Sequence, residues 1–258
     1  MEETATVTID AFHRGGFWLA QPAGRGHRAG MDAMVLAAAV PSGFDGGLAD
    51  LGAGAGAAGF AVAARCPDAD VTLVERDPAM AGFAERSIGL AGNRHLNARV
   101  TLLRADVSLA GKARTAVGLA DRSHDFVIMN PPFNDGADRQ SPDEMKRDAH
   151  VMDVGMFAAW TRTAAAMLRP GGGLALIARP ASLAAALDAA EGRFGALALK
   201  PVHPHAGRPA IRFVLRGVLG SRAGLSIHPP LVLHDDDRRE YTAEADAICN
   251  GAQTLFGD

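Results

Sequence analysis

The chain has 258 residues, of which 48% are hydrophobic, and its formal net charge is −3. This size and composition predict one large α/β core with appendages, and the charge excludes nucleic-acid binding through a basic field spread over the whole protein. Two cysteines without metal or CxxC spacing, no leader sequence and no apolar span of roughly 18 residues predict a cytoplasmic, reduced protein with no membrane segment and no structural metal.

The first 45 residues predict a small unit laid on the core. Residues 7–9 and 17–22 read as short strands on either side of a glycine turn. A helix follows, for which we expect Asp32 to be the N-cap and Pro41 the end. We therefore divide the chain into an N-terminal strand pair and helix, residues 1–45, and a core domain, residues 46–258.

Residues 47–59 predict an apolar strand, a glycine-rich turn and the start of an alanine-rich helix. From Gly54 to Gly59 the letters match the dinucleotide fingerprint, a weak signal in a chain with 30 glycines. From Asp50 they read Asp-x-Gly-x-Gly-x-Gly, and a carboxylate beside a pyrophosphate would be repelled. S-adenosylmethionine carries a sulfonium and an ammonium and no phosphate, so Asp50 favours this cofactor. The expected backbone contacts in the turn are Gly52, Ala53 and Gly54.

Two further carboxylates follow predicted strands. Glu75 comes about 20 residues after the turn, where an acid can accept both ribose hydroxyls of either cofactor. Asp77 is expected to cap a helix that Gly92 closes. Asp106 follows the next strand, residues 99–103, and either accepts the adenine amino group or is an ordinary surface aspartate in a turn.

The apolar run at residues 127–129 stops at Asn130, Pro131, Pro132 and Phe133. A strand cannot continue through two prolines, so these four residues predict a rigid loop at the carboxyl end of a buried parallel strand, where open α/β sheets bind ligands. An amide, a proline carbonyl and a flat ring suit a planar amino group. A turn-capping amide and a core aromatic are the alternatives; the rigid prolines favour catalysis.

The second half of the core is expected to finish the sheet. Residues 134–143 are polar and predict a mobile loop beside the site, and a core helix is expected from about Asp153 to Pro170. After a strand at 174–178 and a helix capped by Ser182, the alternating pattern up to Leu233 predicts an antiparallel pair at the sheet edge.

A basic, acid-free stretch runs from Gly192 to His234. With the arginines between His13 and Met31, which has no acid either, it predicts a phosphate-binding surface for RNA. The alternatives are arginines that guard an edge strand and ordinary solvated surface. The residues expected to contact RNA are Arg28, Lys200, Arg208 and Arg212.

Together, the motifs resemble the class I S-adenosylmethionine-dependent methyltransferases that act on planar exocyclic or amide nitrogens. Within them, the flanks look like the bacterial tRNA(Val) adenosine N6-methyltransferase family. These flanks are Gln21-Pro22, Arg28 to Ala33, His203 to Arg212, and Pro230 to His234. Many adenine enzymes of the group have Tyr at the position of Phe133, whereas Phe is frequent in guanine N2 enzymes. The aromatic side chain is therefore present, but it does not decide which base is methylated.

The resemblance implies a Rossmann-like fold: a mostly parallel seven-stranded sheet, helices on both faces and an antiparallel C-terminal edge hairpin. It implies N6-methylation of an adenosine in tRNA, with further cofactor contacts from Arg28, Asp32, Arg76, Val107 and Asn130. Methylation of guanine N2 or of a protein glutamine amide stays open, because the same loop would serve. A third alternative is a non-catalytic binding module or a nicotinamide oxidoreductase on a similar scaffold.

Overall fold

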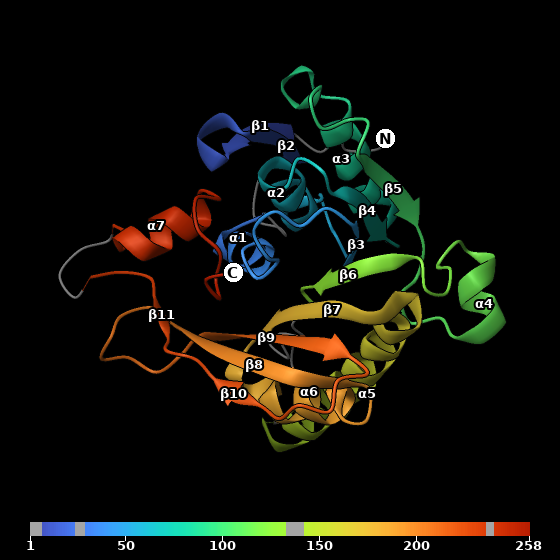
Figure 1. Ribbon diagram of the computed structural model, residues 1–258, viewed down its shortest axis with the longest axis vertical. Helices are drawn as coiled ribbons and strands as arrows, with labels where there is room; N and C mark the ends of the chain where they lie inside the picture. Colours follow the sequence, from blue (N-terminus) through green and yellow to red (C-terminus); the bar gives the residue numbers. More distant parts are fainter. Residues whose placement is uncertain (1–6, 24–28, 133–141, 236–239) are drawn as a thin grey trace.

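The computed structural model describes residues 7–23, 29–132, 142–235 and 240–258 (Figure 1). Its strands are β1 (Val7–Phe12), β2 (Phe17–Pro22), β3 (Gly47–Leu51), β4 (Asp70–Glu75), β5 (Val100–Arg104), β6 (His124–Met129), β7 (Leu168–Ala178), β8 (Phe194–His203), β9 (Arg212–Leu219), β10 (Ser226–Ile227) and β11 (Leu231–Val232). Its α-helices are α1 (Met31–Ala37), α2 (Ala57–Arg65), α3 (Pro78–Ile88), α4 (Gly111–Ala116), α5 (Pro142–Met167), α6 (Leu183–Ala190) and α7 (Ala243–Cys249).

The main sheet has the order β10-β8-β9-β7-β6-β3-β4-β5, and β11 also pairs with β8. Strands β7, β6, β3, β4 and β5 pair in parallel, whereas β9 lies antiparallel between β7 and β8. The predicted mostly parallel, Rossmann-like sheet with an antiparallel edge is therefore confirmed. Within it, β10 and β11 add two-residue parallel pairs to β8, where the pattern up to Leu233 had indicated a returning strand.

Helices cover both faces of this sheet (Figure 1). Helices α1, α2, α3 and α7 contribute to one buried cluster, and α5 and α6 to the other. Successive residues of β3 point to opposite clusters, Leu48 to the first and Ala49 to the second, and both are fully buried. Such a strand must be apolar on both sides, which explains the continuous hydrophobic runs that predict it.

The predicted N-terminal strand pair is present as β1 and β2, and it docks on α3. The backbone N–H of Ala20 donates to the Ser87 hydroxyl at 3.0 Å, and that of Trp18 donates to the Asn93 side chain at 2.9 Å. Phe17 is fully buried in the cluster that α1 and α2 share. The boundary at residue 45 stays a prediction.

Several helix ends differ from the predictions. The N-cap of α1 is Gly30, so Asp32 lies in the first turn instead of capping it. Helix α3 has its C-cap at Gly89, three residues before Gly92. Helix α5 begins at Pro142, well before Asp153, which suits proline because the first helical turn needs no N–H from it.

Strand β7 also begins earlier than predicted and contains Pro170 and three glycines. The register between β6 and β7 shifts between His124 and Phe126, so residues 169–172 lie where the ladder is interrupted and a missing N–H costs nothing. In the described part of the chain, no helix is long and apolar enough to cross a membrane.

Candidate active site

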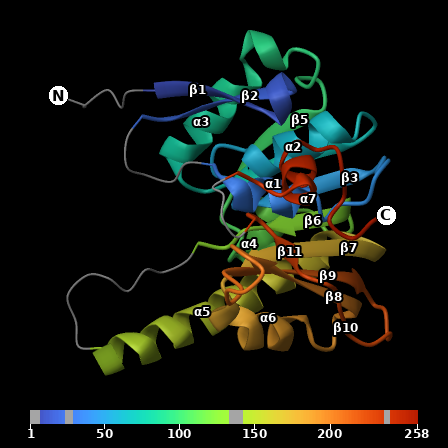
Figure 2. The same ribbon diagram turned by 90° about the vertical axis from the view of Figure 1, so that its left-hand side faces the viewer.

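The carboxyl ends of β3, β4, β5 and β6 meet along one edge of the sheet. In Figure 1 the arrows of β6 and β7 point to the left, and this side of the molecule faces the viewer in Figure 2. Because these strands are parallel and in register, the residues that follow them are brought side by side. The structure thus gathers most of the predicted cofactor and catalytic residues on one edge. They are Asp50, Gly52, Ala53, Gly54, Glu75, Arg76, Asp106, Val107, Asn130, Pro131 and Pro132.

The glycine turn joins β3 to α2 through backbone conformations that residues with a side chain rarely adopt. Gly52, Gly54 and Gly56 have φ of +71°, +58° and +93°. The N–H groups of Gly52 and Ala53 both donate to the Val74 carbonyl, at 2.9 and 3.0 Å. A Cβ on Gly52 would also lie 2.4 Å from the Trp160 ring. The turn is therefore anchored to β4 and leaves room for only a bare backbone at its first glycine.

Glu75 ends β4 and holds the turn in place. Its buried carboxylate accepts the N–H of Gly54 through Oε2 and the N–H of Asp77 through Oε1, both at 2.8 Å. Each carboxylate oxygen keeps a further lone pair for an incoming hydroxyl. Glu75 is thus already fixed at the position where it was predicted to bind ribose.

Asp50 lies beneath the turn instead of beside it. Its side chain is 2% exposed and accepts the N–H of Gly59 in α2 at 2.9 Å. Burial, opposed by that hydrogen bond and reinforced by the charge of Glu75, raises the pKa of Asp50 to about 7. Direct contact with an ammonium group would require an accessible carboxylate, so Asp50 acts on the turn through Gly59.

Asp106 lies just past the end of β5 and is fixed by its neighbours. It accepts the N–H of Ser108 at 2.8 Å and pairs with Arg76 at 3.1 Å. Partial burial would raise its pKa, but the bonds from Ser108 and the charge of Arg76 outweigh it, so the pKa of Asp106 lies below its ordinary value. The Asp106 carboxylate is therefore an anionic acceptor, and Val107 beside it is buried.

Asn130 follows β6, and its side chain carries a buried oxygen, Oδ1, without a hydrogen-bond partner among the described residues. Buried acceptors are nearly always paired, and an unpaired one costs roughly 1 to 3 kcal/mol. Pro131 is buried and Pro132 exposed, so the loop leaves the sheet as predicted. Phe133 lies outside the described residues.

The charges along this edge test which cofactor the site fits. The one cation among the predicted residues placed there, Arg76, is paired with Asp106. The carboxylates there are Glu75, Asp77 and Asp106, whereas Asp50 lies beneath the turn. A pyrophosphate would meet net negative charge, whereas a sulfonium and an ammonium would be attracted. The residues present fit S-adenosylmethionine.

The predicted flanking residues have other partners. Arg212 Nε pairs with Asp32 at 2.7 Å, which joins the start of β9 to α1 and occupies the carboxylate expected to contact the cofactor. The side chain of Lys200 is 11% exposed and binds Glu244 and the Leu255 carbonyl, so its ammonium holds α7 and the segment after it instead of facing solvent. Arg28 lies outside the described residues.

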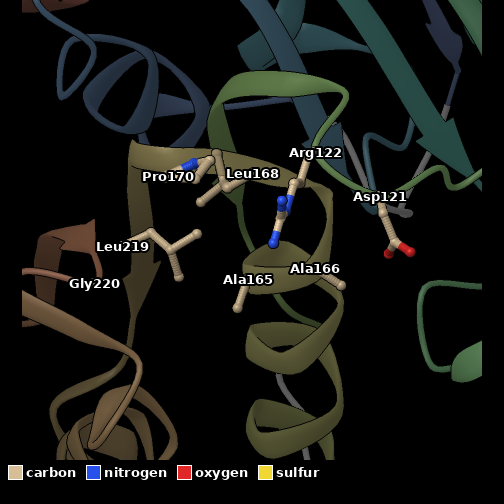
Figure 3. Close-up of a pocket in the computed structure, with 8 residues that line it drawn as sticks. All are labelled: Asp121, Arg122, Ala165, Ala166, Leu168, Pro170, Leu219 and Gly220. Atoms are coloured by element: carbon tan, nitrogen blue, oxygen red, sulfur yellow. The ribbon is translucent and has the colours of Figure 1, made fainter.

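Two features near the sheet ends were not singled out from the sequence. Trp160 of α5 was predicted to be core, and it does pack against the cluster that α5 and α6 share, but it is half-buried and also lies against Gly52; only its place in the helix after the Asn130 loop pointed to the site. A hollow of about 690 Å³ lies at the opposite edge of the sheet (Figure 3). Its lining includes Arg122, Leu168 and Leu219.

Among the described residues, no group of three or more His, Cys, Asp or Glu is placed to hold a metal ion.

Comparison with known proteins gives the family. The family model of the methyltransferase small domain matches residues 28–198. A crystal structure from Agrobacterium tumefaciens, described as a predicted O-methyltransferase, protein Atu636, is 41% identical, with a TM-score of 0.76 over 87% of this chain and 98% of that one. The 16S rRNA N2 G1207 methyltransferase RsmC of T. thermophilus, in complex with AdoMet and guanosine, is 22% identical, with a TM-score of 0.55 over 83% of this chain and 50% of that one, and shares the fold.

No curated protein matches the chain. The family model covers well over half of the 258 residues, and the A. tumefaciens protein is similar over nearly its full length. Together with a glycine turn and an acidic edge that fit the methyl donor, these matches identify the chain as a member of the methyltransferase small domain family, an S-adenosylmethionine-dependent methyltransferase.

Proposed function

We propose that this enzyme methylates N6 of an adenosine in tRNA. The observation that carries the proposal is the buried, unpartnered Oδ1 of Asn130 at the carboxyl end of β6. An acceptor left unsatisfied at the ligand edge of the sheet needs a donor from outside, and an exocyclic amino group supplies one. Pro131 and Pro132 then fix the loop that presents this acceptor.

The chemistry follows from what these groups do to an amino nitrogen. Its lone pair is delocalised into the base and attacks poorly. If Asn130 Oδ1 and the Pro131 carbonyl accept its two N–H groups, the pair becomes localised on nitrogen and points in one direction. Positioning of this kind is worth roughly 7 to 11 kcal/mol, and the proton leaves after transfer, so no strong base is required. When bound, S-adenosylmethionine supplies the electrophilic methyl group.

The proposal that the substrate is RNA is supported by the β8–β9 connection, which emerges at the same edge of the sheet as Asn130. Arg208 is exposed, and its guanidinium has no ionic partner in the described part of the chain. A target base must leave its own stack to reach Asn130, and the Phe133 ring would then stack on it. Arg28 and Arg208 are the proposed phosphate contacts; Lys200 and Arg212 are left out because they are already paired.

Guanine N2 is the second candidate, since the same loop accepts any planar amino group and RsmC, of the same fold, was solved with guanosine. A protein glutamine amide remains the third. Oxygen methylation, suggested by the description of the A. tumefaciens protein, leaves the second acceptor of the loop without a role because a hydroxyl has one hydrogen. Membership of the methyltransferase family removes the oxidoreductase and non-catalytic alternatives.

The test is methyl transfer from labelled S-adenosylmethionine to a pool of unmodified tRNA transcripts, followed by mass spectrometry of the nucleosides. We expect N6-methyladenosine. N2-methylguanosine would establish the second candidate instead. Label in neither nucleoside, with transfer to a protein glutamine or to a hydroxyl, would overturn the proposal. Nucleosides from cells that lack the protein provide the matching measurement in vivo.

A further inference from the structure

A column of three rings stands beside the β8–β9 connection. His205 and His234 have ring centroids 5.6 Å apart, and His234 stacks on Tyr241 at 5.1 Å with an interplanar angle of 12°. We propose that this ring column, His205, His234 and Tyr241, binds an unpaired base of the RNA a few nucleotides from the target nucleotide, with Arg208 on its phosphate. This inference rests on the proposed function.

The ring column lies at the same edge of the sheet as Asn130. Strands β8 and β11 run parallel to each other, and their ladder continues as His234 N–H donates to the Pro204 carbonyl at 3.0 Å. Strand β8 has the direction of β7 and β6, because it is antiparallel to β9, and β9 to β7. Residues after His203 therefore emerge at the ligand edge three strand spacings, or roughly 14 Å, from β6, and residues after Val232 emerge there four spacings, or roughly 19 Å, from β6. A base a few nucleotides from the target spans such a distance.

The histidines are held by their backbones, which fixes their tautomers. Nδ1 of His205 faces the Asp235 carbonyl at 3.3 Å, and Nδ1 of His234 faces the Glu240 carbonyl at 3.1 Å. A carbonyl only accepts, so each Nδ1 carries the hydrogen and donates. The neutral ring then leaves Nε2 as an acceptor, and in neither residue does Nε2 have a protein partner among the described residues. A base or ribose can supply the donor.

Exposure indicates that the ring column is a contact surface. Tyr241 ends the ring column and is 42% exposed, although one of its faces is covered by His234. Its position is fixed, because the next residue, Thr242, donates its N–H to Leu233 and its hydroxyl to Val232, both at 2.8 Å. A rigid exposed ring offers stacking with little entropy to lose, and every base has a face that can use it.

Charge separates the two parts of the surface. Arg208 is exposed, and His203 Nδ1 donates to its carbonyl at 2.6 Å, which orders the loop. Asp235 and Glu240 are described acids beside the ring column, and both are exposed. A phosphate placed there would meet a like charge, so we assign the ring column to a base and Arg208 to the backbone.

The test measures RNA affinity directly, by fluorescence anisotropy with labelled unmodified tRNA transcripts, alongside steady-state kinetics. Tyr241→Ala should weaken RNA binding about 5- to 150-fold, the loss of one stacked base, and raise KM for tRNA. Neither kcat nor the affinity for S-adenosylmethionine should change. Tyr241→Phe, which keeps the ring, should bind within about twofold of wild type. His205→Ala, a substitution in the other loop, should weaken binding in the same direction.

Salt dependence distinguishes the two contacts. Arg208→Ala should reduce the slope of log K against log salt by about 0.7 to 0.9, whereas Tyr241→Ala should leave the slope unchanged. Normal RNA affinity in folded Tyr241→Ala and His205→Ala, judged by wild-type melting temperatures, would overturn the inference even if N6-methyladenosine is the product. If wild type binds RNA but forms another product, only the proposed function fails. If wild type binds no RNA, both fail.

Discussion

At the scale of single residues, the buried oxygen of Asn130 gives the sharpest prediction. Asn130→Ala removes the acceptor that we propose to act on the transferring nitrogen, so kcat should fall about 10²- to 10³-fold while the Kd for S-adenosylmethionine stays within a few-fold. Single-turnover kinetics and calorimetry measure the two quantities. Asn250→Ala is the matched control, because that amide only bonds Asp246 in the last turn of α7. Weak cofactor binding at a normal residual rate would contradict the role.

The residues of the motifs could be predicted from sequence, but their partners could not. Glu75 and Asn130 follow strands, and parallel strands end together, so their place at the ligand edge follows from pattern alone. Asp50 is part of the same motif, yet it lies beneath the turn and bonds Gly59. No pattern in the letters tells which way a carboxylate faces. The same reason explains why Asp32 and Lys200 were assigned to ligands and found in ion pairs.

Among the elements, helices α2 and α3 predict opposite outcomes for the same glycine-to-alanine substitution. Alanine normally stabilises a helix relative to glycine by about 0.5 to 1 kcal/mol. A Cβ on Gly82 of α3 would meet nothing within 4 Å, so Gly82→Ala should gain about that much. A Cβ on Gly59 of α2 would lie 2.3 Å from Leu73, so Gly59→Ala should lose roughly 1 to 3 kcal/mol. Denaturant unfolding measures both, and equal signs would refute the packing argument.

Helix α5 predicts an optical signal. The chain has two tryptophans, and Trp160 of this helix lies against Gly52, whereas Trp18 lies against Gly92, far along the sequence from the turn. A cationic ligand over the turn would come near the indole of Trp160. Addition of S-adenosylmethionine should change the tryptophan emission of wild type and Trp18→Phe but not of Trp160→Phe. An unchanged response in Trp160→Phe would show that the ring does not border the cofactor.

Most elements could be predicted because their periodicity is strong. The alternation of apolar runs with helical stretches gives the parallel sheet, and turn residues such as Asp77 and Thr242 cap the helices that follow them. The two-residue strands β10 and β11 have no periodicity to read. Pro170 inside β7 was misread as a helix terminator, because the interrupted ladder that tolerates it exists only once β6 is beside it.

At the scale of the whole molecule, the pH dependence of stability should reflect His13, which packs between the N-terminal strand pair and the segment after α7. His13 follows β1, its ring packs edge-on to Phe17, and a Cβ on Gly251 would strike it. Burial and the charge of Arg65 lower the pKa of His13 from 6.5 to about 4. Between these values the unfolded chain binds more protons, so stability is full above about pH 6.5 and falls as the pH drops towards 4.

Asp50 titrates in the same pH range, and because its pKa is raised, its contribution makes stability fall as the pH rises. A variant of His13 is therefore needed to isolate the contribution of the histidine. His13→Asn keeps a residue that tolerates the left-handed backbone at this position, where φ is +48°. The loss of unfolding free energy from pH 6.5 to pH 4 should be smaller in His13→Asn than in wild type. Identical pH profiles from urea titrations would show that the imidazole binds protons equally in the folded and unfolded states.

The reversed direction of β9 has a consequence for how this enzyme could diversify. Because β9 starts where β7 ends, the connection from β8 opens on the same side as the donor turn, and β9, β7 and β6 lie between the two. Under the proposed function, binding of the methyl donor and choice of the RNA substrate would lie in separate parts of the chain. Replacing the stretch between His203 and Arg212 by that of a homologue should therefore change which RNA is modified and leave the affinity for S-adenosylmethionine unchanged.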